Sequence, residues 1–180
     1  MSTYVLIHGA GSDGWYWHRV APLLRERGHD VVAPDLPVGD ERALVEEDRS
    51  LLPNAIEESL RLEPAASVID RYATADVELE GAPIRRGDLV RISIAAANRD
   101  PAVFPDPDRF DVQRENAHRH IAFAHGPHVC IGMHLARLEA HSAVARLLDR
   151  LPALRLDPAR PAAPRGLVFR KPPELNVLWT

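Results

Sequence analysis

The N-terminal 40 residues carry two short apolar strand patterns on either side of one helical pattern. Residues 3–7 are β-prone and run into a glycine-rich turn. Apolar residues then recur at spacings of three and four through 15–27, and Gly28 ends that pattern. A second buried strand follows at 31–33. Strand, helix and strand at this spacing predict a βαβ unit with two parallel strands.

After residue 40 the pattern changes to helices followed by short strands. Residues 42–47 and 54–62 have helical periodicity. Residues 72–94 contain strand-like pieces, separated by turns expected at Glu80-Gly81 and Arg86-Gly87. This second part is therefore expected to mix helices with small antiparallel strands.

The strongest helical pattern lies at 131–151, after two irregular stretches at 98–110 and 120–130. Its apolar stripe consists of Met133, Ala136, Ala140, Val144, Leu147 and Leu151. The polar residues Arg137, His141 and Arg146 are expected in solvent. The predicted fold class is mixed α and β. A short βαβ unit (1–40) is followed by an α+β portion (41–180).

Composition narrows the function classes. Hydrophobic residues make up 46% and charged residues 27%, which allows a core and a soluble surface. A net charge of −4 without a basic run gives no reason to expect a nucleic-acid partner. No apolar run reaches the ~18 residues of a membrane span, and no signal peptide is evident. The single cysteine excludes an internal disulfide, so a cytoplasmic protein is predicted.

Two motifs compete in the first 40 residues. The segment Gly9-Ala10-Gly11-Ser12-Asp13-Gly14 matches GxGxxG, the dinucleotide-binding fingerprint. The bulky Trp15-Tyr16-Trp17 that follows disfavours close packing of a helix on a sheet, so this match is interpreted as accidental. His8-Gly9, the two tryptophans and residues 31–36 instead resemble the start of an α/β-hydrolase. No GxSxG nucleophile follows, and Ser12 is interpreted as a turn or cap residue.

The chemistry is concentrated in residues 123–132. The only cysteine, Cys130, directly precedes the long helix, whose N-terminal partial charge stabilises a thiolate. Gly126 and Gly132 allow a tight backbone around the sulfur, and Phe123 can cover it. A shielded thiolate that faces backbone N–H groups is a strong donor to heme iron.

This segment resembles the heme-binding loop of the cytochrome P-450 family. The resemblance implies heme b as cofactor, Cys130 as the iron ligand and His128 as a partner of one heme propionate. Asp70-Arg71-Tyr72-Ala73-Thr74 resembles the strand whose arginine meets the other propionate. The implied cofactor-binding set is Arg71, Phe123, Gly126, His128, Cys130 and Gly132.

Two further motifs support the same resemblance over residues 42–180. Glu58-Ser59-Leu60-Arg61 is an ExxR pair that shares one helix face. Residues 107–110 resemble the meander motif whose arginine joins that pair. The resemblance thus implies a structural ion network of Glu58, Arg61 and Arg109 behind the heme.

The implied function is heme-thiolate monooxygenation of a small organic substrate, with electrons from a redox partner such as a ferredoxin. No helix with the family's oxygen-activating acid and threonine is found before Glu58, which favours a truncated protein. A non-catalytic heme-binding remnant and an α/β-hydrolase-like interaction module are therefore kept as alternatives. A zinc site is a further alternative, using His125, His128, Cys130 and His134.

Overall fold

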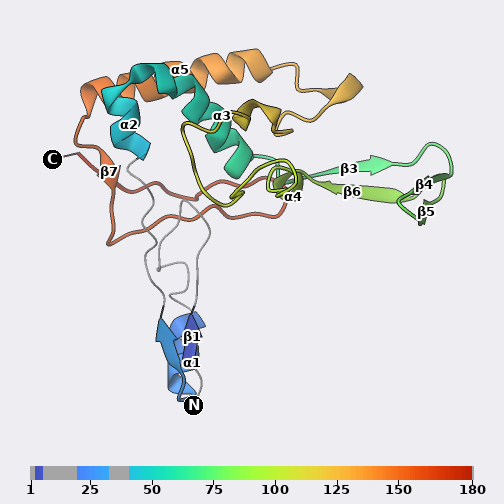
Figure 1. Ribbon diagram of the computed structural model, residues 1–180, viewed down its shortest axis with the longest axis horizontal. Coiled ribbons are helices and arrows are strands. Elements are labelled where there is room, and N and C mark those ends of the chain that lie inside the picture. Colours follow the sequence, from blue (N-terminus) through green and yellow to red (C-terminus); the bar gives the residue numbers. More distant parts are fainter. Residues whose placement is uncertain (1–2, 6–19, 33–40, 180) are drawn as a thin grey trace.

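The first three elements form a small βαβ unit. The computed structural model describes residues 3–5, 20–32 and 41–179. Strand β1 (Thr3–Val5) pairs in parallel with β2 (Asp30–Val32), and helix α1 (Val20–Glu26) lies between them in sequence. The predicted parallel pair is confirmed, and Figure 1 shows these elements together at one end of the chain. The glycine motif at 9–14, with Ser12, lies outside the described residues.

Three consecutive helical segments open the second part. Helix α2 (Glu41–Glu47) is followed by the 3-10 turn η2 (Arg49–Leu51) and by α3 (Leu52–Leu62). Helix α3 begins two residues earlier than expected because Pro53 sits in its first turn, where its missing N–H costs nothing. This start brings Leu52 into the core, where it is 3% exposed.

The core lies where α3 packs beside α5 (Met133–Arg150). Val45, Leu52, Ile56 and Val112 form its buried centre. The α5 residues packed against it are Ala140, Val144, Ala145 and Leu148. The predicted stripe on α5 is therefore right at Ala140 and Val144. It is wrong at Ala136, which is exposed, and at Leu147, which is 44% exposed, because Leu148 packs against the core instead.

A long hairpin projects from the end of α3. Strand β3 (Val68–Tyr72) pairs antiparallel with β6 (Leu89–Ser93), and β4 (Val77–Leu79) with β5 (Ala82–Ile84) extends it. Glu80 and Gly81 at its tip have φ angles of 48° and 82°, and Gly87 has 92°. Both expected turns are confirmed, because these positions need the left-handed backbone that glycine adopts without strain.

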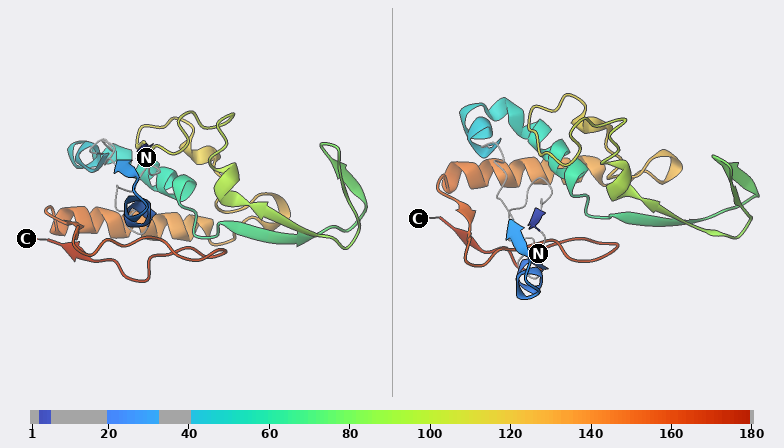
Figure 2. Two further views of the ribbon diagram at one scale, coloured as in Figure 1. Left: turned by 90° about the horizontal axis from the view of Figure 1, so that it is seen from below. Right: turned by 60° about the horizontal axis from the view of Figure 1, so that its bottom comes forward.

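Little regular structure links the hairpin to α5. Helix α4 (Ile94–Ala97) leads into an irregular meander at 98–116, then the 3-10 turns η3 (Ala117–Arg119) and η4 (Gly126–His128). Figure 2 shows this segment looping on the same side as α3.

The proline-rich C-terminal segment crosses back along the molecule as extended chain. Within it β7 (Arg155–Leu156) pairs antiparallel with β8 (Val177–Leu178). The segment therefore consists of loops and short strands. The fold is mixed α and β, as predicted. No helix of the described residues is long and apolar enough to cross a membrane.

Candidate functional site

Two charged side chains of α3 are completely buried. Glu58 and Arg61 both have no exposed side-chain surface, and they lie one turn apart on the same helix face. Arg61 Nε donates to Glu58 Oε2 at 2.7 Å, and Nη2 donates to Oε1 at 2.9 Å. A buried pair needs its remaining donors and acceptors satisfied to offset its desolvation.

Arg61 meets that need by donating to the backbone of the meander. Its Nη1 donates to the carbonyl oxygens of Asn98 at 2.9 Å and Pro107 at 2.7 Å, and Nη2 donates to that of Arg109 at 3.0 Å. The guanidinium carbon also lies 5.3 Å from the centroid of the Phe104 ring. One side chain of α3 therefore holds three points of an irregular segment.

The third member of the network is Arg114 and not Arg109. Arg114 Nε donates to Glu58 Oε1 at 3.0 Å, and its side chain is only 6% exposed. The Arg109 side chain is 61% exposed and lies 3.8 Å from Glu41. The physical reason is the turn at Asp106–Arg109, which aims the Arg109 carbonyl, and not its side chain, at the buried pair.

The loop before α5 is closed by its own backbone and presents the cysteine at the surface. The N–H of Cys130 donates to the carbonyl of Phe123 at 2.9 Å, and that of Val129 to Gly126 at 3.0 Å. Gly126 has a φ of 75°, which the tight turn requires. Cys130 is a free, exposed thiol. Its carbonyl accepts the N–H of Met133, so the sulfur-bearing residue directly precedes α5.

The surroundings of the thiol fit a heme. Gly132 precedes α5 without a side-chain cap, and a Cβ at this glycine would lie 3.9 Å from the Cys130 sulfur. Its neighbours Val129 and Ile131 are exposed apolar side chains, as a flat apolar ligand resting on the loop would require. A zinc cage is not supported, because the described residues hold no group of three or more His, Cys, Asp or Glu side chains suited to a metal ion.

A second ion pair lies against the same loop. Arg137 of α5 donates to both oxygens of Glu57 on α3, from Nε to Oε1 at 2.6 Å and from Nη2 to Oε2 at 2.7 Å. These bonds lower the pKa of Glu57 and raise that of Arg137. The expectation that Arg137 is solvated is therefore wrong. The pairing of Arg137 with Glu57 could not be predicted from the sequence, because the two residues lie 80 positions apart.

The ring of Phe123 belongs to this second network. Its centroid lies 4.8 Å from the Arg137 guanidinium carbon and 6.0 Å from the His120 ring. Phe123 therefore packs against these two side chains, and Cys130 is exposed to solvent.

His120 is a buried residue that no motif of the sequence singles out. Its Nδ1 accepts the N–H of Ala122 at 3.0 Å, which leaves the ring proton on Nε2. That Nε2 lies 3.2 Å from Glu57 Oε2 but is not aligned for a hydrogen bond. Burial lowers the pKa of His120, with Glu57 acting in the opposite direction, so the ring is neutral at neutral pH.

The two predicted propionate partners are exposed. Arg71 lies on β3 opposite Val90 and donates to the Asp70 carbonyl at 2.8 Å. His128 ends η4, two residues before Cys130. The hairpin and the loop before α5 extend to the same side of the molecule in all three views (Figures 1 and 2). Their roles toward a heme stay predictions.

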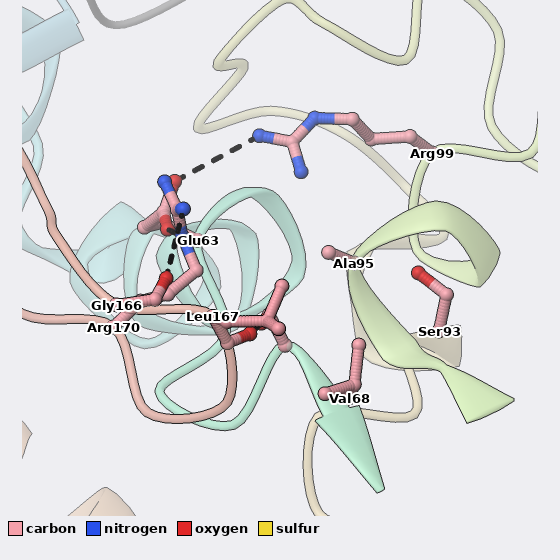
Figure 3. A pocket seen from close by; sticks show the side chains of 9 residues that line it. Glu63, Val68, Ser93, Ala95, Arg99, Gly166, Leu167 and Arg170 are labelled. Atoms are coloured by element: carbon pink, nitrogen blue, oxygen red, sulfur yellow. Dashed lines mark hydrogen bonds and ion pairs between the residues drawn. The ribbon is translucent and has the colours of Figure 1, made fainter. Parts of the chain in front are cut away.

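A hollow of about 350 Å³ lies elsewhere, where the end of α3 meets the C-terminal segment. Glu63 forms ion pairs with Arg99 and Arg170 beside it (Figure 3). The N–H of Ser67 also donates to the Val168 carbonyl at 2.8 Å, which ties the hairpin base to this segment. Neither cysteine nor histidine lines the hollow, so it is a junction between segments and not the site of the thiol chemistry.

Comparison with protein families matches the part of the chain that carries these networks. The model of the cytochrome P450 family matches residues 38–178. The match covers helices α2 to α5, the hairpin, the meander and the cysteine loop.

Individual relatives show the same similarity. The cytochrome P-450 monooxygenase PikC of Streptomyces venezuelae is 45% identical over 88% of this chain and 39% of its own length. The 20-oxo-5-O-mycaminosyltylactone 23-monooxygenase of Streptomyces fradiae is 51% identical over 58% of this chain and 25% of its own length. The chain thus spans well under half the length of these relatives.

The fold is shared with solved structures. The LnmA hydroxylase from the leinamycin biosynthetic pathway of Streptomyces atroolivaceus superposes with a TM-score of 0.69 and 44% identity. The superposition covers 78% of this chain and 37% of that structure.

Proposed function

The chain belongs to the cytochrome P-450 family, and on that premise we propose that Cys130 would hold a heme b by its thiolate. The observation that carries this proposal is the free, exposed thiol on a loop closed by the Cys130–Phe123 backbone hydrogen bond. The loop directly precedes α5, whose first turn has no side-chain cap, and the positive end of a helix dipole favours a thiolate.

The remaining predicted site residues have roles that support this ligand. Gly126 supplies the left-handed turn of the loop, and Gly132 leaves space beside the sulfur. Phe123 accepts the Cys130 N–H and packs behind the loop. Arg71 and His128 donate to the two propionates, for which their exposed nitrogens are suited.

When bound, the heme supplies oxygen activation at its iron, helped by electron donation from the thiolate. The residues of this chain would form the face of the heme site that carries the thiolate. Glu58, Arg61 and Arg114 act structurally, by fixing the meander behind the loop. The activity of the whole protein is then monooxygenation of a small organic molecule, in line with the monooxygenases among its relatives. A ferredoxin-like redox partner in the cytoplasm supplies the electrons.

Residues 1–40 form a separate unit in this proposal, with 41–180 as the heme-binding portion. The parallel β1–β2 pair supports a βαβ unit, and the proposal of an α/β-hydrolase type rests on His8-Gly9 and residues 31–36 of the sequence. Since the sequence contains no GxSxG nucleophile, we expect no hydrolase chemistry from this unit.

The test is a heme titration of the purified chain and of Cys130→Ala, each read as the reduced, carbon-monoxide-bound absorption spectrum. The parent should show the band of a thiolate-ligated heme, and Cys130→Ala should lose it. His125→Ala, in the same loop, is the control and should keep it. Equal spectra for the parent and Cys130→Ala would disprove the ligand. A parent spectrum without the thiolate band, but with a histidine-ligated heme that is lost in His125→Ala, would assign the iron to that histidine.

A further inference from the structure

Adjacent glutamates on α3 serve two different ion networks. Glu58 faces Arg61 and Arg114, as described above. Glu57 faces α5, where its carboxylate accepts two parallel hydrogen bonds from Arg137 at 2.6 and 2.7 Å. The Glu57 side chain is 16% and that of Arg137 31% exposed. This partly shielded, bidentate geometry is the strong form of a carboxylate–guanidinium pair.

A continuous set of contacts leads from Arg137 to Cys130. The Arg137 guanidinium carbon lies 4.8 Å from the centroid of the Phe123 ring, within the range of a cation–π contact. The carbonyl of the same Phe123 accepts the N–H of Cys130 at 2.9 Å. The position of the cysteine backbone therefore depends on Phe123, and that of Phe123 on a guanidinium that Glu57 orients.

Glu57 also reaches the chain before the loop. Its Oε2 lies 3.2 Å from Nε2 of the buried His120. The other nitrogen of that ring accepts the N–H of Ala122 at 3.0 Å, and the ring packs beside Phe123. One carboxylate thus contacts the side chains on both flanks of the cysteine loop, His120 before it and Arg137 after it.

We propose that Glu57 is a positioning residue for the heme ligand: through Arg137, Phe123 and His120 it sets the place of the Cys130 sulfur. The inference rests on the proposed ligation of heme by Cys130 and adds a residue that does not touch the heme. Groups that orient a metal ligand typically change metal affinity about 10- to 100-fold when they are replaced. They do so by displacing the ligand, and the fold stays intact.

The test compares Glu57→Gln and Arg137→Lys with the parent in heme titrations and reduced, carbon-monoxide-bound spectra. Glu57→Gln keeps the size of the side chain and removes its charge, while Arg137→Lys keeps the charge and removes the bidentate fork. Both should weaken heme binding about 10-fold or more and lower the fraction of heme in the thiolate-ligated band. Glu46→Gln, in the exposed Glu46–Arg42 pair of α2, is the control and should match the parent.

Amide hydrogen exchange of the heme-free chain separates this inference from the heme assignment. In Glu57→Gln and Arg137→Lys the amides of Ala122 and Cys130 should exchange faster, with those of α3 unchanged. If the parent takes up no heme, the proposed function fails and the exchange data alone decide on Glu57. Parent-like spectra and loop exchange in Glu57→Gln would overturn the positioning role. So would a uniform loss of stability without any change in the thiolate band. If Glu57→Gln does not fold, Arg137→Lys decides by the same criteria.

Discussion

Arg114 and Arg61 share the buried carboxylate of Glu58, with Arg114 Nε 3.0 Å from Oε1 and Arg61 Nε 2.7 Å from Oε2. Two positive charges thus meet one negative charge where the side chains are almost fully buried. Backbone carbonyls offset the excess positive charge, since Arg114 donates to Pro105 at 2.6 Å and to Asp106 at 3.1 Å. The backbone of the meander is in effect part of the ion network.

The first prediction concerns the order of stability losses in this network. Glu58→Gln leaves two buried guanidinium groups without a carboxylate and should lower the free energy of unfolding by about 3–5 kcal/mol. Arg114→Ala should cost less, about 1–3 kcal/mol, because Glu58 keeps Arg61 and the N–H of Asp111. Urea unfolding followed by circular dichroism measures both.

Arg109→Ala is the matched control for this series. Its guanidinium is 61% exposed and lies 3.8 Å from Glu41, so the loss should stay within about 1 kcal/mol. A larger loss for Arg109→Ala than for Arg114→Ala would show that the third arginine has been misassigned.

The second prediction concerns pH. Burial holds the pKa of His120 below its ordinary value of 6.5, so below pH 6.5 the unfolded chain binds a proton that the folded chain does not. The contribution of His120 to stability is therefore complete above pH 6.5. It falls by up to about 1.4 kcal/mol per pH unit from there to the folded pKa.

His120→Asn should flatten this pH dependence while its side-chain oxygen still accepts the Ala122 N–H. Urea unfolding between about pH 5 and 7.5 measures the effect. His141→Asn, at an exposed position on α5, should keep the parent's slope. A slope that persists unchanged in His120→Asn would mean that another group causes it.

The third prediction concerns Ala124, which has a φ of 62° in the loop before Cys130. The left-handed conformation costs a residue with a Cβ about 1–2 kcal/mol, whereas glycine adopts it freely. Ala124→Gly should therefore raise the midpoint of thermal unfolding, with a gain of about 1 kcal/mol. Ala122→Gly is the control and should lower it, because Ala122 is not in that conformation. Stabilisation by both or by neither would contradict the strain at Ala124.

The fourth prediction separates two glycines of the same loop. Gly126 has a φ of 75° with open space where a methyl group would lie, so Gly126→Ala should cost about 1 kcal/mol through the backbone alone. Gly132 has a φ of −85°, which alanine adopts, and its Cβ would touch only the Cys130 sulfur. Gly132→Ala should leave the unfolding free energy unchanged within about 0.5 kcal/mol. Thermal unfolding of the two variants beside the parent provides the measurement.

Elements whose determinants lie close together in sequence could be predicted. Glu80-Gly81 and Arg86-Gly87 contain the residues that their turns require, and Glu58 and Arg61 share a helix face because they are three residues apart. The Arg114–Glu58 and Arg137–Glu57 pairs span 56 and 80 residues. No periodicity of the chain links such partners, since they meet only after α3 has packed beside the meander and α5.

Arg109 illustrates a different limit. The motif pointed to the right residue, but the functional group that enters the network is its carbonyl oxygen and not its guanidinium. Every residue has a carbonyl, so the side chains in a sequence cannot indicate which one is used.

The three hydrogen bonds that Arg61 donates to backbone carbonyls also affect the kinetics of folding. They close loops of 37, 46 and 48 residues that contain the β3–β6 hairpin and α4, and they end on a meander without a helix or strand of its own. Contacts at such separations incur their loop-closure entropy before they contribute any stability, so they are expected to form after the rate-limiting barrier. Interactions that are absent from the transition state act mainly on the unfolding rate. Arg61 would then govern how long the native state lasts more than how fast it is reached.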